Sequence, residues 1–504
     1  MSGPKRFRPA MAWLHTWAGL VVGWVLFAIF VTGTASYYKG EITRWMRPEL
    51  TERAVDSAAA ATLAGEFLLR QMPDAAGWYV QLPKFDEPVT EVYWWKSLAG
   101  PFHHALLDPA TGQPTEARDT RGGDFLYRFH FELALPSLWG RWIVGACAMV
   151  LLIALISGIV THRRFFADFF TFRPGRSRQR AWLDAHNLFG VLALPFHLMI
   201  TYTGLVTLGP MLMPWGIEAA YRDKAPDYVV EAGLMPAGRL PAGRPAAGLP
   251  LGDIVRTAEG TGGEVPEALM VASPGDAAAT VGAVFEEPHG LAHLHPQIAY
   301  DGVTGAEIGR NGTPGAATRT ATVLYGLHEA HFATPVLRVL FFLCGALGAA
   351  AVASGLVLWT VARAPKGAAL DGVGLSFVRI LNIGTIAGLP AGIGAFFLAN
   401  RLLPVVLAGR ASWEIGFFFG SWLLVAAIGA LAPRRHAWPA TLGLAGALFL
   451  ALVPADLALV GQARFVAFDG AMLAVATLLI VAARAASRPP AALARHAPAG
   501  ALGA

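Results

Sequence analysis

Apolar residues in this chain occur in long uninterrupted runs, and polar stretches separate the first of these runs from one another. The runs begin at 11–38 and continue at 135–162, 182–213 and 324–363. A helix rises about 1.5 Å per residue, so about 20 apolar residues cross the hydrocarbon core of a bilayer. Each run is long enough, and the sequence therefore predicts four membrane-spanning helices in this part of the chain.

A second apolar region, 376–484, contains four further runs with short connections and no histidine inside the runs. The whole chain is 55% hydrophobic and 14% charged, with a mean hydropathy of +0.49, which is far from the composition of a soluble domain. The predicted fold class is an all-α polytopic membrane protein with eight transmembrane helices. Asp456 and Asp469 fall near the ends of the C-terminal runs, where we expect them to be solvated.

The two polar stretches, 41–128 and 214–321, are predicted to form two small α+β domains outside the membrane. The first contains a helical pattern around Ser57 to Gln71 and three strand-like segments, GWYVQLP, TEVYWW and FHHALLD. The second contains a helical patch and two strand candidates, at 253–258, 269–272 and 279–286. Both stretches include turn sequences, DPATG and DGVTG, whose Asp, Pro and Gly residues favour tight turns.

Basic residues indicate on which side of the membrane each loop lies. The loop at 163–181 is rich in arginine, and loops rich in Lys and Arg stay on the cytoplasmic side. We therefore expect this loop and both termini to be cytoplasmic and the polar domains to be periplasmic. The net charge is only +5 and the basic residues cluster in short loops, so they are interpreted as topology signals and not as a nucleic-acid-binding surface.

The order of helix, polar domain and helix occurs twice, which indicates an internal repeat. His15, Gly19, Thr32 and Gly33 recur at one constant spacing as His186, Gly190, Thr203 and Gly204, and Arg141, Cys147 and Gly158 recur at another as Arg338, Cys344 and Gly355. Both copies start on the same side, so the sequence predicts a tandem parallel repeat. The two cysteines are interpreted as small interior residues inherited with it.

Histidines inside the apolar runs carry the candidate chemistry. His186 and His197 are eleven residues apart, and eleven steps of about 100° return a helix to nearly the same face. An ionisable side chain at membrane depth normally faces the bundle interior and has a function. The two histidines are therefore interpreted either as axial ligands of haem groups stacked across the membrane or as residues hydrogen-bonded to neighbouring helices.

Depth along the predicted helices sorts the candidate histidines into groups. A cytoplasmic-side group contains His15, His162 and His186, an outer group contains His130, His328 and His331, and His197 lies near the middle without an obvious partner. A six-coordinate haem needs two imidazoles at one depth from facing helices. The sequence therefore predicts about two haem b groups per chain, held without covalent attachment because no CxxCH motif occurs.

Two other sets of residues remain open to two interpretations. Arg141 and Arg338 lie at equivalent outer positions, where they either neutralise haem propionates or extend to the membrane interface as snorkelling arginines. His289, His293 and His295 form an HxxxHxH cluster in the second polar stretch, which is either solvated or a metal site.

Several segments together resemble the PepSY-associated transmembrane family. They are WLHTWAGL, LYRFH, SGIVTHRRFFADFFTFRP, WLDAHNLFGVLALPFHLMITYTGL and LYGLHEAHF, and they cover roughly residues 10–365. The two turn sequences are similar to the closing turn of PepSY domains. The resemblance implies a multi-pass protein of the bacterial inner membrane that binds b-type haem and reduces a periplasmic ferric siderophore, with release of Fe²⁺.

The electron donor is expected to be membrane quinol or a separate reductase, because the chain has no nucleotide-binding motif and no flavin domain. Apart from the haems, no catalytic residue is expected. Two alternative classes remain, a secondary transporter and a non-enzymatic PepSY regulatory or assembly protein. The presence or absence of haem absorbance distinguishes them from the reductase.

Overall fold

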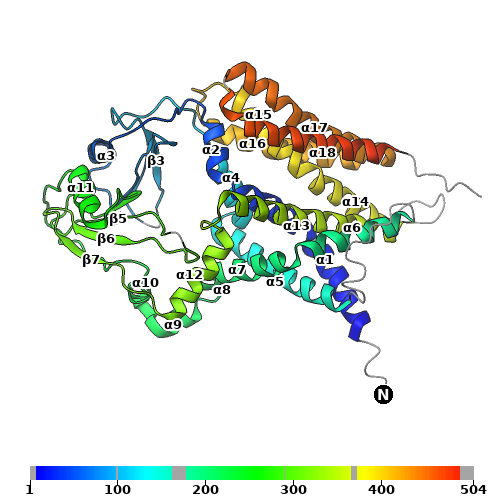
Figure 1. The fold of residues 1–504 in the computed structure, drawn as a ribbon, viewed down its shortest axis with the longest axis horizontal. Coiled ribbons are helices and arrows are strands. Elements are labelled where there is room, and N and C mark those ends of the chain that lie inside the picture. The colour runs from blue at the N-terminus through cyan, green and yellow to red at the C-terminus, as the bar shows by residue number, and fades with distance from the viewer. Residues whose placement is uncertain are drawn as a thin grey trace, which may run out of the picture. The chain divides into compact units, whose positions relative to one another are not determined.

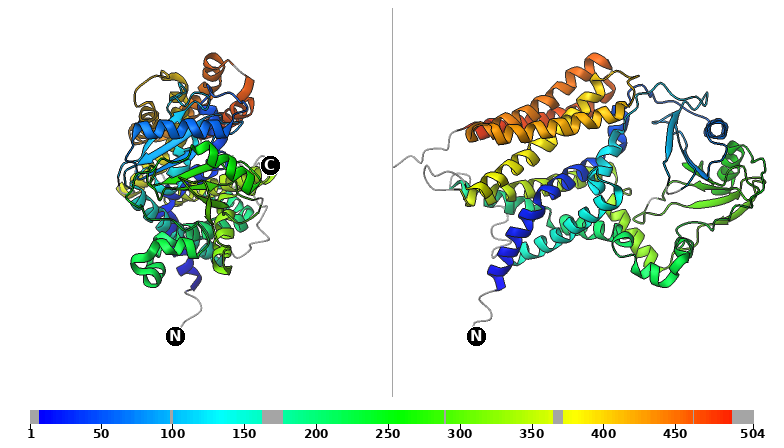
Figure 2. Two further views of the ribbon diagram at one scale, coloured as in Figure 1. Left: turned by 90° about the vertical axis from the view of Figure 1, so that its left-hand side faces the viewer. Right: turned by 180° about the vertical axis from the view of Figure 1, so that it is seen from behind.

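The computed structural model of the chain describes residues 7–97, 100–161, 177–288, 290–364, 372–461 and 463–488. The chain forms two compact units, Met1–Phe172 with Asp184–Val352, and Arg173–Leu183 with Ala353–Ala504. The first unit contains a β-sheet and the helices that carry most of the candidate histidines, and the second contains the C-terminal helices (Figures 1 and 2).

Seven helices among the described residues are long and apolar enough to cross a membrane. They are α1 (Phe7–Ser36), α5 (Ser137–Thr161), α13 (Pro335–Ala362), α14 with α15 (Val373–Ile386 and Gly388–Leu402), α16 (Arg410–Leu431), α17 (Arg434–Leu459) and α18 (Val466–Ser487). Two further helices, α6 (Arg178–Leu192) and α7 (Leu194–Thr207), pass the test together but are bent by 66°. The number of candidate spans is therefore seven, or eight if the bent pair is one span.

The bend between α6 and α7 corrects the expectation of one continuous helix over 182–213. Pro195 lies in the first turn of α7, and Ala193 before it has non-helical backbone angles. Proline has no backbone N–H and cannot continue the hydrogen-bond ladder of a preceding helix. His186 therefore lies on α6 and His197 on α7, and the prediction that both occupy one face of a single helix is wrong.

The expected helix over 324–363 is also divided. The first part, α12 (Ala316–Glu329), ends at Ala330 in the left-handed conformation with φ 59°, and α13 begins at Pro335. The same pattern occurs earlier in the chain, where α4 (Gly122–Glu132) ends at Leu133 with φ 54° and α5 follows. The helices α4 and α12 thus form separate elements beside the candidate spans.

The two polar stretches form one antiparallel sheet of seven strands in the order β3-β2-β1-β4-β5-β6-β7. The strands are β1 (Gly77–Gln81), β2 (Thr90–Trp95), β3 (His103–Leu107), β4 (Ala268–Ala272), β5 (Thr280–Val284), β6 (Gln297–Asp301) and β7 (Glu307–Arg310). β1 from the first stretch pairs with β4 from the second, with Trp78 opposite Val271. The expectation of two separate domains is therefore corrected to one joint sheet domain.

Joining the two halves also builds their core. The helices α3 (Ser57–Gln71) and α11 (Leu251–Gly262) pack against each other and cover one face of the sheet (Figure 1). Val80 and Leu269, which lie opposite each other in β1 and β4, are fully buried in one core cluster that includes residues from both helices. A three-stranded sheet under one helix has unpaired edges and a small core, and the β1–β4 pairing removes one edge of each half.

Both turns predicted from the DPATG and DGVTG sequences are present, and an aspartate holds each of them. The Asp301 side chain accepts hydrogen bonds from the backbone N–H groups of Val303 and Thr304 at 2.9 and 2.8 Å, and from Arg239 at 2.9 Å. These hydrogen bonds, above all that from Thr304, lower the pKa of Asp301 to about 2. The ionised carboxylate is therefore part of the folded turn.

Replacement of Asp301 with alanine is expected to destabilise the sheet domain by about 1 kcal/mol, because turn N–H groups lose their acceptor. The folded pKa lies below the ordinary value, so this stabilisation is present above about pH 4 and is lost as the pH falls toward 2. Thermal unfolding of the detergent-purified protein should show a difference between wild type and variant at neutral pH that narrows below about pH 4.

The matched control is Asp253→Ala, which removes an exposed ion pair with Arg256 on α11. Exposed pairs of this kind contribute little. An equal loss of stability in both variants would contradict the role assigned to the turn.

Candidate functional site

Four of the predicted histidines come together as two pairs. His15 on α1 lies beside His186 on α6, with ring centroids 6.0 Å apart. His130 on α4 lies beside His328 on α12, with ring centroids 6.1 Å apart. Each pair combines a histidine of residues 15–130 with one of residues 186–328, and its members share a predicted depth.

The four rings are oriented in the same way, by hydrogen bonds to backbone carbonyl groups. The Nδ1–H group of His15 donates to the carbonyl of Ala154, and that of His186 donates to the carbonyl of Ala351, each at 2.8 Å. The Nδ1–H group of His130 donates to the carbonyl of Ile29 at 2.8 Å, and that of His328 donates to the carbonyl of Ile200 at 3.1 Å. With the proton on Nδ1, the other ring nitrogen, Nε2, keeps its lone pair. The carbonyl acceptors recur at the same constant spacings as the motifs in the sequence.

Glycines allow the close approach of the rings to the neighbouring helices. A Cβ atom added to Gly33 would lie 2.6 Å from the ring of His130, and one added to Gly204 would lie 2.8 Å from His328. On Gly158 it would lie 3.1 Å from His15. Any larger residue at Gly33 or Gly204 would displace the ring, which explains why these positions carry no side chain.

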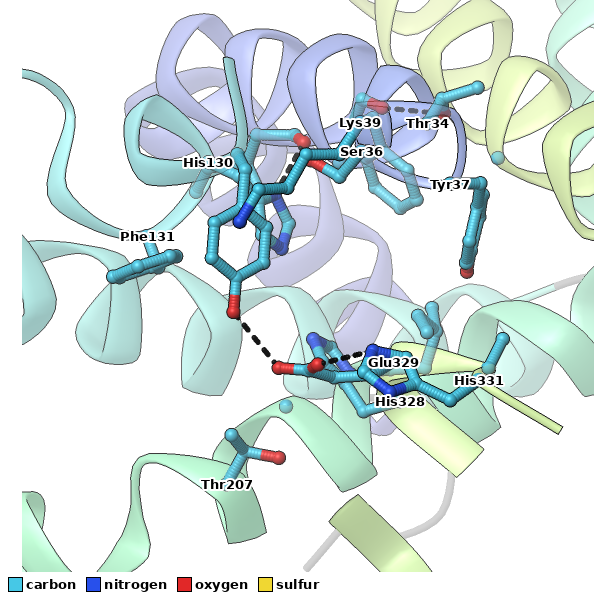
Figure 3. Close-up of a pocket in the computed structure, with 18 of the residues that line it drawn as sticks. Thr34, Ser36, Tyr37, Lys39, His130, Phe131, Thr207, His328, Glu329 and His331 are labelled. Carbon is cyan, nitrogen blue, oxygen red and sulfur yellow. Dashed lines mark hydrogen bonds and ion pairs between the residues drawn. The ribbon is translucent and has the colours of Figure 1, made fainter. Parts of the chain in front are cut away.

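The His130–His328 pair lies in the wall of a cavity of about 900 Å³ (Figure 3). Burial lowers the pKa of both rings, to about 4 for His328, so both are neutral at physiological pH. Arg141 and Arg338 also line the cavity and pair with Glu132 and Glu41, respectively. The lining of the cavity thus combines apolar side chains with both cationic and anionic side chains.

The other predicted site residues lie outside the two pairs. His197 is buried, and its Nε2 lies 3.2 Å from the carbonyl of Cys344, with the rings of Phe30 and Phe196 beside it. His331 is partly exposed and lies beside carboxylates. His162 and His289 fall outside the described residues. Cys147 and Cys344 are both free, as expected of small interior residues.

The C-terminal unit contains buried charges that the sequence analysis did not predict. Arg401 pairs with Asp456, and both side chains are fully buried. Arg410 pairs with Glu414, which also accepts a hydrogen bond from Asn400. The expectation that Asp456 and Asp469 are solvated is wrong, since Asp456 is 0% and Asp469 only 7% exposed. Ionisable residues beside apolar runs are a partial signal, because such residues often pair with one another within a helix bundle, but the choice of partner depends on how α15 and α17 pack.

Comparison with known proteins places these features in a family. The profile described as PepSY-associated TM region matches residues 12–362, which include all four paired histidines and the sheet domain. An uncharacterized protein from Pseudomonas aeruginosa is 28% identical over 359 residues, covering 66% of this chain and 86% of that protein.

Removal of one partner of the buried Arg401–Asp456 pair is expected to be strongly destabilising. Asp456→Ala leaves a guanidinium group buried without its counter-charge, which costs about 3–5 kcal/mol. The double variant Arg401→Leu/Asp456→Leu should recover much of this loss, because no isolated charge remains. Thermal unfolding in detergent measures both, and a double variant as unstable as Asp456→Ala would contradict this explanation.

Proposed function

The chain belongs to the PepSY-associated transmembrane family, and from this premise we propose that it is a di-haem b oxidoreductase of the bacterial inner membrane. Its proposed substrate is a periplasmic ferric siderophore, whose Fe³⁺ is reduced to Fe²⁺ and released. The observation that supports this proposal is the presence of two pairs of adjacent histidines whose Nδ1 atoms are oriented by backbone carbonyl groups. The fold is proposed to be a tandem repeat with eight spans and both termini in the cytoplasm.

The spacing within each pair would allow both imidazoles to bind one iron ion. Metal–imidazole bonds of about 2.0–2.1 Å, with about 1 Å more from each nitrogen to the ring centre, would place the two ring centres no more than roughly 6 Å apart. The observed centroid separations are 6.0 and 6.1 Å.

Ring orientation supports the same assignment. A metal-binding histidine usually donates its second ring N–H to a carbonyl or carboxylate, which fixes the tautomer and raises the basicity of the ligating nitrogen. All four rings donate in this way to backbone carbonyl groups. His15 with His186 would hold one haem, and His130 with His328 the other. Bound haem supplies one-electron transfer between the two sides of the membrane.

The cavity around His130 and His328 is proposed to hold the second haem and to admit the chelate. Its volume of about 900 Å³ falls in the range of about 300–1,000 Å³ typical of cofactor sites. Lys39, Arg44, Arg141 and Arg338 line it and are proposed to neutralise propionates. Asp86 and Glu87 of the sheet domain also line it, so the sheet domain borders the proposed substrate approach.

Electrons are proposed to enter at the His15–His186 pair, from membrane quinol or a separate reductase, and to leave at the His130–His328 pair. His130 and His328 lie on α4 and α12, beside the candidate spans. A siderophore is too large and polar to enter the bilayer, so we propose that reduction occurs at this pair.

The number of bound haems should depend on the number of intact histidine pairs. Alanine at His186 or at His328 is expected to lower bound haem from about two per chain to about one, because each change removes one ligand of one pair. The control is His197→Ala, which should retain about two haems, since His197 lies outside both pairs. Acid-acetone extraction and the pyridine haemochrome spectrum give the haem content, and equal loss in all three variants would contradict the pairing.

The two pairs should also differ in the step that they support. His328→Ala is expected to leave a haem signal that quinol still reduces, while reduction of an external ferric chelate falls at least about tenfold. His186→Ala is expected to leave a haem that dithionite reduces but quinol does not. The measurements are haem absorbance after each reductant and Fe²⁺ formation with a colorimetric chelator.

If both variants reduced the ferric chelate at the normal rate and kept their full haem content, we would conclude that the histidines have only a structural role. A transporter or a regulatory protein would then be the better interpretation. Bound haem also contributes to folding, so the amount of folded protein has to be measured in each sample.

A further inference from the structure

Three side chains near the end of α12 converge without belonging to either histidine pair. Glu287 and His293 lie in the segment between β5 and β6, and His331 follows α12. One nitrogen or oxygen atom from each lies within 4.8 Å of the corresponding atoms of the other two. Two imidazoles and one carboxylate form the ligand set of mononuclear Fe²⁺ and Zn²⁺ sites that keep positions open.

Two of the separations are close to those of atoms bound to one metal ion. Bonds of about 2.1 Å place neighbouring ligand atoms about 3.0 Å apart at octahedral angles and about 3.4 Å apart at tetrahedral angles. Nδ1 of His293 lies 3.2 Å from one oxygen of Glu287, and Nδ1 of His331 lies 3.4 Å from the other oxygen. Nδ1 of His293 is buried and makes no hydrogen bond within the described part of the chain.

Groups around these residues hold them in place. Nε2 of His331 lies 2.9 Å from Glu329 (Figure 3), and Glu329 also accepts a hydrogen bond from Tyr127. A carboxylate behind a histidine in this way is the usual second partner of a metal-binding imidazole. The backbone N–H of Leu294 donates to Glu287 at 2.5 Å. The side chains of His331 and Glu287 are thus held in position by neighbouring groups of the protein.

The loop that carries His293 is fixed on α12. The N–H of His293 donates to the carbonyl of Thr322 at 2.9 Å, and a Cβ atom on Gly326 would lie 2.0 Å from the carbonyl oxygen of Leu291. The loop therefore packs directly on the helix because position 326 has no side chain. His293 and His331 also line the cavity that contains His130 and His328.

We propose that Glu287, His293 and His331 form a binding site for a divalent first-row transition-metal ion. Its occupant in the cell is Fe²⁺, and this part of the proposal depends on the proposed function. Fe³⁺ accepts one electron at the His130–His328 end of the cavity, and the resulting Fe²⁺, weakly held by a siderophore built for Fe³⁺, passes to the triad. The site thus takes the product of the reduction and opposes its recapture.

Metal binding tests the site without reference to activity. The full-length, haem-loaded protein in detergent is treated with a chelator to remove weakly bound metal and is then dialysed against Co²⁺ or Zn²⁺. Elemental analysis gives the amount of bound ion. One equivalent is expected to bind in the wild type, with affinity at least about tenfold lower in Glu287→Gln and His293→Ala. Fe²⁺ binds sites of this kind less tightly than Co²⁺, so an excess of Fe²⁺ added without oxygen should displace the bound Co²⁺.

The matched control is His295→Ala, which changes a histidine two residues away that pairs with Glu267, and it should retain the affinity of the wild type. No binding in the wild type, or binding that Glu287→Gln and His293→Ala leave unchanged, would overturn the site. Haem content is measured in the same samples. Full haem without metal binding rejects the triad alone, whereas metal binding by a protein without haem rejects the proposed function and retains the metal site.

Discussion

The hydrogen bond from Nδ1 of each paired histidine to a backbone carbonyl is the contact on which the rest of the site depends. A buried polar group without a partner is costly, and one carbonyl per ring satisfies Nδ1 while leaving Nε2 with its lone pair. Gly33 and Gly204 make this approach sterically possible for His130 and His328. The positions of α1, α4, α7 and α12 are therefore coupled to the orientation of the two rings.

Much of the membrane part could be predicted from the sequence because its signals are local. The lengths of the apolar runs located most spans. The repeated spacing of His15, Gly33, His186 and Gly204 identified residues that the structure places at the histidine pairs. The bend at Pro195 and the turn after Ala330 were not predicted, because an uninterrupted apolar run gives no indication that the helix is broken within it. His197 lies after the bend, and the simple helical periodicity that grouped it with His186 does not apply across a break.

Other features required contacts between segments far apart in the chain. The helix at Ser57–Gln71 and the strand candidates of both polar stretches are confirmed, but no local pattern indicates that β1 pairs with β4 across almost two hundred residues. The burial of Asp456 against Arg401 likewise depends on how α15 and α17 pack. His331 was predicted in a group with His328 and instead lies beside Glu287 and His293, because α12 ends between the two histidines.

The most direct measurement of the central claim is the low-temperature electron paramagnetic resonance spectrum of the oxidised, purified protein. Two imidazole ligands on one ferric haem give a low-spin spectrum, and two such pairs should give low-spin signals that integrate to about two haems per chain. A high-spin ferric spectrum, or a protein without haem after expression with an ample supply, would contradict the assignment of His15 with His186 and His130 with His328 as axial ligands.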